Sequence, residues 1–118
     1  MRILSLTASL RFSPDRHVYT TLAETPHSAI SVVGWEAGQA SPIHSHPDAD
    51  EIYHVLEGQG LFDDGRTQAR LGPGDTVIFP AGEVHRVHAL TRMVLYRVQA
   101  GADRRPEPVD AWPEARPA

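Results

Sequence analysis

Cysteine and lysine are both absent from this chain of 118 residues. Without cysteine, the protein cannot contain a disulfide, a thiolate nucleophile, an iron–sulfur cluster or a cysteine-ligated zinc site. Without lysine, it cannot form a Schiff base or use a lysine as a general base. The 11 positively charged side chains are all arginines, which we attribute to a compositional bias toward arginine and alanine.

The chain also lacks an excess of positive charge and a long apolar run. Fifteen acidic residues outnumber the 11 arginines, and the formal net charge is −4. Proteins that hold nucleic acid through its phosphates normally have a basic excess, so we expect no nucleic-acid partner. No stretch approaches the roughly 18 apolar residues of a membrane span, so we expect no membrane association. The N-terminal apolar run is short and Arg11 interrupts it, which favours a starting strand or arm over a signal peptide and therefore a cytoplasmic protein.

The sequence that is present has the pattern of an all-β fold. Short runs rich in valine, isoleucine, threonine and aromatic residues recur between clusters of glycine, proline and aspartate, as in a sandwich or barrel. Asp63–Gly65 is a hairpin signal, and Leu71–Asp75 is a tight connection that no helix would tolerate. The expected strands are Val18–Leu22, Ala29–Glu36, Glu51–Leu56, Gly60–Phe62, Thr67–Leu71, Thr76–Phe79, Glu83–Ala89 and Arg92–Val98.

The length suits one compact domain, which we place at residues 1–100. A chain of this size buries roughly two-thirds of its unfolded surface, which is enough for a hydrophobic core. From Gly101 onward the sequence contains four prolines and no apolar periodicity. We therefore expect residues 101–118 to form a proline-rich tail, either flexible or extended over the body, with Trp112 as its anchor.

Seven histidines are many for so short a chain, and some have a spacing that suits metal binding. His44 and His46 are two residues apart, so on an extended segment both side chains point to the same face. Glu51 follows after a polar turn, and His85 lies on another expected strand. Convergence of these four side chains inside a barrel would create a mononuclear divalent-metal site with open positions for water or substrate. Taken alone, a His-x-His pair is more often a surface feature.

The same residues belong to two longer patterns. The first consists of Gly38, His44, His46, Glu51 and Gly58, and the second of Gly74, Pro80, Gly82 and His85. With their spacings, these residues resemble the two motifs of the cupin family and match nine of the ten specified positions, across residues 38–89. The tenth position is an asparagine in the family and Ala89 here. This departure weakens the transfer of any specific family activity but leaves the potential metal ligands intact.

The resemblance implies a cupin-type jelly-roll β-barrel, or double-stranded β-helix, that can enclose a ligand cavity. It also implies His44, His46, Glu51 and His85 as ligands of one divalent transition metal. Imidazole and carboxylate suit Mn, Fe, Co, Ni, Cu or Zn, so the ligand set does not select the metal. A closed structural zinc site is less expected, because such sites are usually rich in cysteine.

Strand alternation sorts the neighbours of these ligands. The residues expected to face the cavity are Tyr53, Val55, Val87 and Ala89, and those expected to face away are Ile52, His54, Leu56, Arg86 and His88. His54 and His88 are therefore expected at the surface or at a subunit interface rather than at the metal. His17 and His27 lie near turns and need no functional account. The residues that are either pocket walls or plain core are Trp35, Tyr53, Phe79 and Tyr96.

Two functions from different classes are compatible with these residues. The first is a metal-dependent enzyme acting on a small molecule, such as the dioxygenases, decarboxylases and sugar-phosphate isomerases of the cupin family. In that case Glu51 and Tyr53 are the expected catalytic residues: Glu51 could accept a substrate proton, and Tyr53 could orient the bound ligand. The second is a non-catalytic module that binds or senses a small ligand, because fold alone does not decide function.

A homodimer is also expected. Open jelly-roll sheets present edges, and the segment Met1–Leu6 alternates like an edge strand that could pair with a second subunit. Ile52 and Leu56 would add apolar surface on the outer face of the sheet.

Overall fold

The computed structural model describes residues 1–113, which contain ten strands and no helix long and apolar enough to cross a membrane. The strands are β1 (Val18–Thr25), β2 (Ser28–Trp35), β3 (His44–Ser45), β4 (Asp50–Glu57), β5 (Gly60–Asp63), β6 (Gln68–Leu71), β7 (Thr76–Phe79), β8 (Arg86–Ala89), β9 (Met93–Ala100) and β10 (Glu107–Pro108). The predicted all-β class is confirmed.

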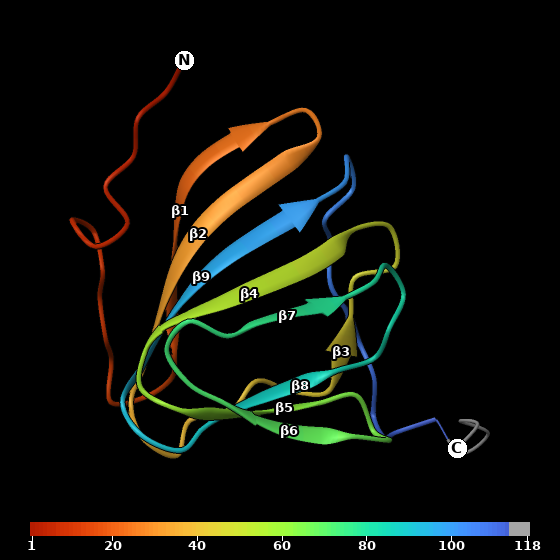
Figure 1. Cartoon of the computed structure of the whole chain (residues 1–118). Helices are drawn as coiled ribbons and strands as arrows, with labels where there is room; N and C mark the ends of the chain where they lie inside the picture. Colours follow the sequence, from red (N-terminus) through yellow and green to blue (C-terminus); the bar gives the residue numbers. More distant parts are fainter. Residues whose placement is uncertain (114–118) are drawn as a thin grey trace.

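The strands form three antiparallel sheets. The largest has the order β1-β2-β9-β4-β7, the second the order β6-β5-β8, and the smallest pairs β10 with β3. In Figure 1 the five-stranded sheet curves over the three-stranded one, and β3 lies near the ends of β4 and β7. Neighbouring strands in the large sheet are distant in the sequence, because β9 inserts between β2 and β4. This arrangement agrees with the predicted jelly roll.

All eight predicted strands are present, with ends that differ by a few residues. The predicted strand Glu83–Ala89 begins only at Arg86, because His85 forms an isolated bridge with His44 instead. The prediction of a strand at Met1–Leu6 is wrong: these residues adopt no strand. Within the described chain their one hydrogen bond to another element joins Arg2 Nη1 to the Glu24 carbonyl, so they lack the ladder that a strand requires.

The core lies between the two larger sheets and is made by residues from alternate positions. The buried cluster consists of Val33, Trp35, Tyr53, Val55, Phe62, Phe79, Val87, Ala89, Met93 and Leu95. The predicted alternation is confirmed, because Tyr53 and Val55 on β4 and Val87 and Ala89 on β8 are all buried. Along the inner face of the large sheet, these apolar residues give way to Ser31, Glu51, Arg97 and Gln99 at one end. The polar end of this face is where a functional site can lie.

The glycines of the two motifs make the turns that connect these strands. Gly38, Gly58, Gly74 and Gly82 all have positive φ angles, a conformation that L side chains rarely adopt. At Gly58 the chain also approaches another segment closely, since a Cβ would overlap the Arg92 carbonyl. The motif glycines are therefore explained by backbone geometry.

After β9 the chain crosses back over the body in an extended conformation. Gly101 N donates to the His27 carbonyl at 2.7 Å, β10 pairs with β3, and Val109 N donates to the Ile43 carbonyl at 3.1 Å. Of the two expected states of the tail, residues 101–113 thus adopt the extended one, whereas residues 114–118 lie outside the described part of the chain. The boundary between a domain and a tail at residue 100 stays a prediction.

Candidate metal centre

Three short segments bring the four predicted ligands together. His44 is on β3, His46 follows it, Glu51 is on β4, and His85 directly precedes β8. The backbones of His44 and His85 bond each other in both directions, with N···O distances of 3.1 and 2.8 Å. One ligand atom from each of the four side chains lies within 4.8 Å of all the others. The sequence therefore predicted which residues converge, and their service as metal ligands remains a prediction.

Each of the three imidazoles is held by a backbone carbonyl. His44 Nδ1 lies 2.8 Å from the Pro42 oxygen, His46 Nδ1 3.0 Å from the Arg104 oxygen, and His85 Nδ1 2.9 Å from the Glu83 oxygen. A carbonyl can only accept, so the proton of each neutral ring is on Nδ1 and the lone pair is on Nε2. Such bonds fix the tautomer and ring orientation of metal-ligating histidines.

Two of the atoms that face the centre are buried and lack hydrogen-bond partners in the described part of the chain. Glu51 Oε2 lies 2.5 Å from His46 Nε2 and 3.2 Å from His85 Nε2. Glu51 Oε2 and His85 Nε2 nevertheless have no partner with hydrogen-bond geometry among the described residues. Lone pairs that face each other in a buried site are stabilised by a proton or a metal cation between them. The donor set of three imidazoles and one carboxylate thus fits a divalent transition metal.

The pKa directions follow from this crowding. Burial opposes charge on Glu51, yet the close imidazoles of His46 and His85 hold the pKa of its carboxyl far below the usual range. Burial also opposes charge on His46, but the Glu51 carboxylate outweighs it and raises the pKa of His46. Burial lowers the pKa of His44. The Glu51 carboxylate is therefore charged, and in the metal-free protein a proton on His46 can balance it.

The second oxygen of Glu51 faces two other side chains. The Tyr53 hydroxyl donates to Glu51 Oε1 at 2.6 Å, and Arg97 Nη1 lies 3.6 Å from the same oxygen. Burial and the neighbouring Glu51 charge raise the pKa of Tyr53 well above its ordinary value, so this residue stays a neutral donor. One edge of the carboxylate thus faces the imidazoles, while the other faces Tyr53 and Arg97.

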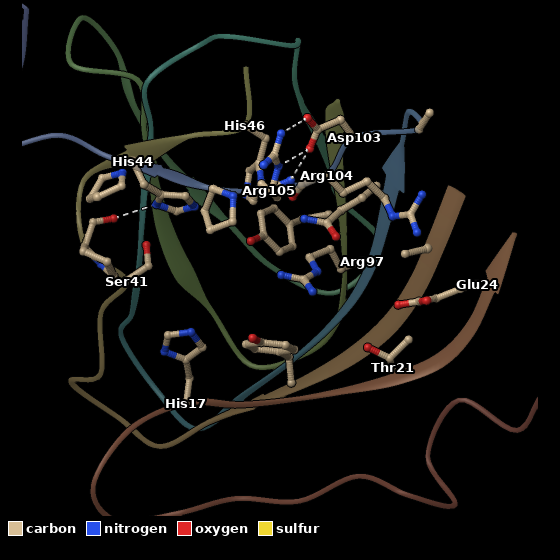
Figure 2. Close-up of a pocket in the computed structure, with 18 residues that line it drawn as sticks. His17, Thr21, Glu24, Ser41, His44, His46, Arg97, Asp103, Arg104 and Arg105 are labelled. Atoms are coloured by element: carbon tan, nitrogen blue, oxygen red, sulfur yellow. Dashed lines mark hydrogen bonds and ion pairs between the residues drawn. The ribbon is translucent and has the colours of Figure 1, made fainter. Parts of the chain in front are cut away.

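A cavity of about 650 Å³ opens beside the cluster (Figure 2). His44, His46 and Tyr53 line it, whereas Glu51 and His85 lie beneath, each only 1% exposed. The other lining residues are His17, Tyr19, Thr21, Glu24, Ala29, Ser41, Pro42, Arg97, Gln99, Ala102, Asp103, Arg104, Arg105, Pro106 and Pro108. The extended segment after β9 therefore forms one wall, and a small molecule in the cavity would reach the cluster past His44 and His46.

The structure also locates the histidines and aromatic residues that the sequence left outside the ligand set. His17 was expected to have no functional place, but it lines the cavity and stacks on Trp35 at 4.1 Å between ring centroids. Tyr96 is not a wall: it pairs with His54 on the outer side of the sheet. Trp35 and Phe79 are buried core residues, and Phe79 stacks on His85 at 4.1 Å. His54 and His88 lie away from the cluster, as expected.

The sequence reasoning missed Arg97 and the wall formed by residues 102–108. Alternation on β9 contained the signal for Arg97, because Leu95 is a core residue and Arg97 is two positions further on the same face. No comparable signal marked the wall, since its contacts join residues that are about 60 positions apart, such as His46 and Arg104.

Comparisons with known proteins agree with this geometry. A family model described as a cupin domain matches residues 31–99. A conserved protein from Klebsiella pneumoniae with a double-stranded β-helix domain is similar in fold, with a TM-score of 0.84 at 23% identity over 94% of this chain and 99% of that one. The DMSP lyase DddQ from Ruegeria pomeroyi is 32% identical with a TM-score of 0.71, over 97% of this chain and 62% of that one.

Matches to curated sequences are shorter. An acireductone dioxygenase from Rhodopseudomonas palustris is 38% identical over 66 residues, which are 51% of this chain and 39% of that enzyme. The chain spans less than two thirds of the length of the curated relatives it matches. The family model, in contrast, covers more than half of the chain and both motifs, and the fold agrees with it. This protein is therefore a member of the cupin family.

Proposed function

We propose that this protein is a metal-dependent enzyme that acts on a small molecule at the centre formed by His44, His46, Glu51 and His85. The observation that carries the proposal is the convergence of three Nε2 atoms, each with its Nδ1 bonded to a carbonyl, on a buried carboxylate beside a cavity. A divalent transition metal bound there would supply Lewis acidity and, where it is redox-active, electron exchange with dioxygen.

The protein's own side chains supply proton handling and orientation. Glu51 Oε1 points away from the imidazoles toward the Tyr53 hydroxyl, which lines the cavity, and in this proposal the carboxylate accepts a substrate proton through that hydroxyl. The Tyr53 hydroxyl, 2.6 Å from that oxygen, orients the carboxylate and lines the cavity where the substrate binds. Residues 102–106 and 108 line the cavity on the side of the segment that follows β9.

Two reaction types deserve testing within this proposal, and different similarities favour them. Similarity to an acireductone dioxygenase favours oxygen-dependent cleavage of an enediol or diketone. Similarity along nearly the whole chain to the DMSP lyase DddQ favours elimination, in which a proton leaves carbon and a leaving group departs without oxygen. A non-catalytic binding module is the alternative to both.

One set of measurements separates these functions. Protein purified without a histidine tag should contain close to one divalent metal per chain. After metal removal, it is reloaded without oxygen with Fe(II), Mn(II), Ni(II) or Zn(II). Each form is then tested with enediols, diketones, flavonols, sugar phosphates and DMSP for oxygen uptake and for product. Turnover with redox-active ions but not Zn(II) supports the oxygenase, and product without oxygen uptake supports elimination or isomerisation.

Variants assign the residues. His44→Ala/His46→Ala should abolish metal binding, and retention of full metal in this double variant would refute the site. Tyr53→Phe keeps the ring in the core and removes only the hydroxyl, so we expect retained metal and turnover reduced roughly 100-fold, the scale of one general acid–base contact. Tight ligand binding without product under any metal would leave the binding module.

A further inference from the structure

Arg97 places a positive charge on the inner face of the large sheet. In the register of β9, Arg97 lies between Ser31 on β2 and Tyr53 on β4, and it lines the cavity beside the candidate metal centre. The side chain is only 13% exposed. Burying a guanidinium costs folding free energy unless a counter-ion balances its charge and acceptors bind its N–H donors. The groups around Arg97 therefore indicate its function.

The described residues leave this guanidinium poorly matched. Nη1 is 3.6 Å from Glu51 Oε1, which is too long for a hydrogen bond, and that oxygen already accepts from Tyr53. Nη2 donates to Ser31 Oγ at a long 3.4 Å, and Nε is buried with no partner. Arginine carries five N–H donors, and among the described residues only one of them, on Nη2, makes a hydrogen bond. Donors on Nη1 and Nη2 therefore remain for a ligand in the cavity that Arg97 lines (Figure 2).

The charges around the cavity leave room for a further anion. Two carboxylates line the cavity. Asp103 accepts hydrogen bonds from Arg105 Nε at 2.9 Å and from Arg105 Nη2 at 2.6 Å, and Glu24 is exposed on β1. Arg104 is a third arginine that lines the cavity. When a divalent cation is bound at the centre, Arg97 shares its nearest carboxylate, that of Glu51, with this cation, so the positive charges there exceed the negative charge of Glu51.

Building on the proposed function above, we infer that Arg97 binds the carboxylate of the substrate, so that the substrate class is small carboxylic acids with a second oxygen donor for the metal. The planar guanidinium fork matches a carboxylate in geometry and charge. The Tyr19 ring, 4.8 Å from Arg97 Cζ, and Ser31 hold the side chain in place. Because Arg97 lies 3.6 Å from the carboxylate of the proposed ligand Glu51, the two substrate groups must be separated by only a few bonds.

The test compares glycolate with its uncharged amide, glycolamide, and uses acetohydroxamic acid as a chelator that lacks a carboxylate. Affinities are measured by calorimetry on Co(II)-loaded protein, and the visible Co(II) spectrum reports whether a ligand reaches the metal. We expect glycolate to bind roughly 10- to 100-fold more tightly than glycolamide, the range of a hydrogen-bonded charge. Arg97→Gln should remove this preference, Arg97→Lys should keep part of it, and Arg86→Gln, an exposed arginine on β8, should keep all of it.

The outcomes separate this inference from the proposed function. Acetohydroxamic acid should change the Co(II) spectrum equally in all variants; if it fails to do so in the wild type, the open metal site is refuted. Calorimetry of glycolate on the metal-free wild type and Arg97→Gln proteins then still tests Arg97. Equal affinity for glycolate and glycolamide in the wild type, which requires no variant to fold, overturns the inference. Inorganic phosphate that binds through Arg97 where glycolate does not would overturn the carboxylate class.

Discussion

The surroundings of His17 favour its neutral form. Its ring lies flat on Trp35, with 4.1 Å between centroids and an angle of 10°. Burial, with Arg97 and Arg16 nearby, lowers the pKa of His17 below 6.5. As pH falls, His17 therefore becomes protonated at a higher pH in the unfolded chain than in the folded chain. The stability contribution of neutral His17 is complete above pH 6.5 and is lost as pH falls toward the folded pKa.

We therefore predict that wild type and His17→Gln differ in their pH dependence. The free energy of unfolding of the wild type should fall relative to that of the variant as pH drops below 6.5, whereas the difference between them should be constant above about pH 7.5. Denaturant unfolding of both proteins in the metal-free state, from pH 5 to 8, measures this. A difference that is independent of pH would contradict the lowered pKa.

Gly58 and Gly74 provide a matched pair for the cost of a side chain in a turn. Both have positive φ, of 78° and 93°, but a Cβ would overlap the Arg92 carbonyl only at Gly58, and nothing lies within 4 Å at Gly74. Gly74→Ala should lower the free energy of unfolding by about 1–2 kcal/mol through backbone strain. Gly58→Ala adds overpacking and should lower it by about 2–5 kcal/mol. Equal effects in denaturant titrations would refute the close approach.

At the scale of residues, the sequence predicted the site better than its surroundings. His44, His46, Glu51 and His85 could be predicted because a fixed spacing ties each of them to a turn or to a strand face. Arg97 was not predicted, although alternation on β9 places it on the inner face, because a charged residue at a core-facing position contradicts the rule that places charge in water. It makes sense only once the cavity beside it is known.

At the scale of elements, the segment after β9 holds the candidate centre together. The Arg104 carbonyl accepts from His46 Nδ1, and β10 pairs with the strand that carries His44. Removal of residues 102–118 should therefore weaken metal binding 10- to 100-fold, the usual effect of losing a bond that orients a ligand. Chelator competition with Zn(II) measures this.

The control for this truncation is a shorter one. Removal of residues 114–118 spares every contact described above, so its metal affinity should equal that of the wild type. If the longer truncation folds, as judged by circular dichroism, and binds Zn(II) as tightly as the full chain, the orienting function of this segment is refuted.

The elements that the sequence did not predict share a physical cause. β3 and β10 contain two residues each, and both are strands only because they pair with each other across more than 60 positions. Local alternation and propensity carry no information on such a pair. Met1–Leu6 shows the opposite error, because its alternation favours a strand but no neighbouring strand pairs with it. Strand pattern and strand partner are separate requirements.

At the scale of the whole molecule, the large sheet divides its inner face into an apolar part and a polar part. The apolar part, around Val55 and Leu95, packs against Phe62 and Val87 of the smaller sheet and supplies the core. The polar part contains Glu51, Arg97 and Gln99 and borders the cavity. The core and the candidate site thus lie at different ends of one sheet face. Substitutions in the polar part can therefore change ligand binding without creating a cavity in the core.

The expected homodimer stays a prediction, and we now place its interface at β7. Met1–Leu6 forms no strand, whereas β7 is an outer strand of the large sheet and Ile78 on it is 58% exposed beside Ile52. An exposed apolar residue on a sheet edge suits pairing with a second copy.

We expect light scattering to give twice the chain mass of 13.0 kDa, and Ile78→Glu to give the single mass. Ile3→Glu, at an exposed N-terminal position, should leave the dimer intact. A wild-type mass of one chain at all concentrations would refute the dimer, and dissociation by Ile3→Glu alone would return the interface to the N-terminal segment.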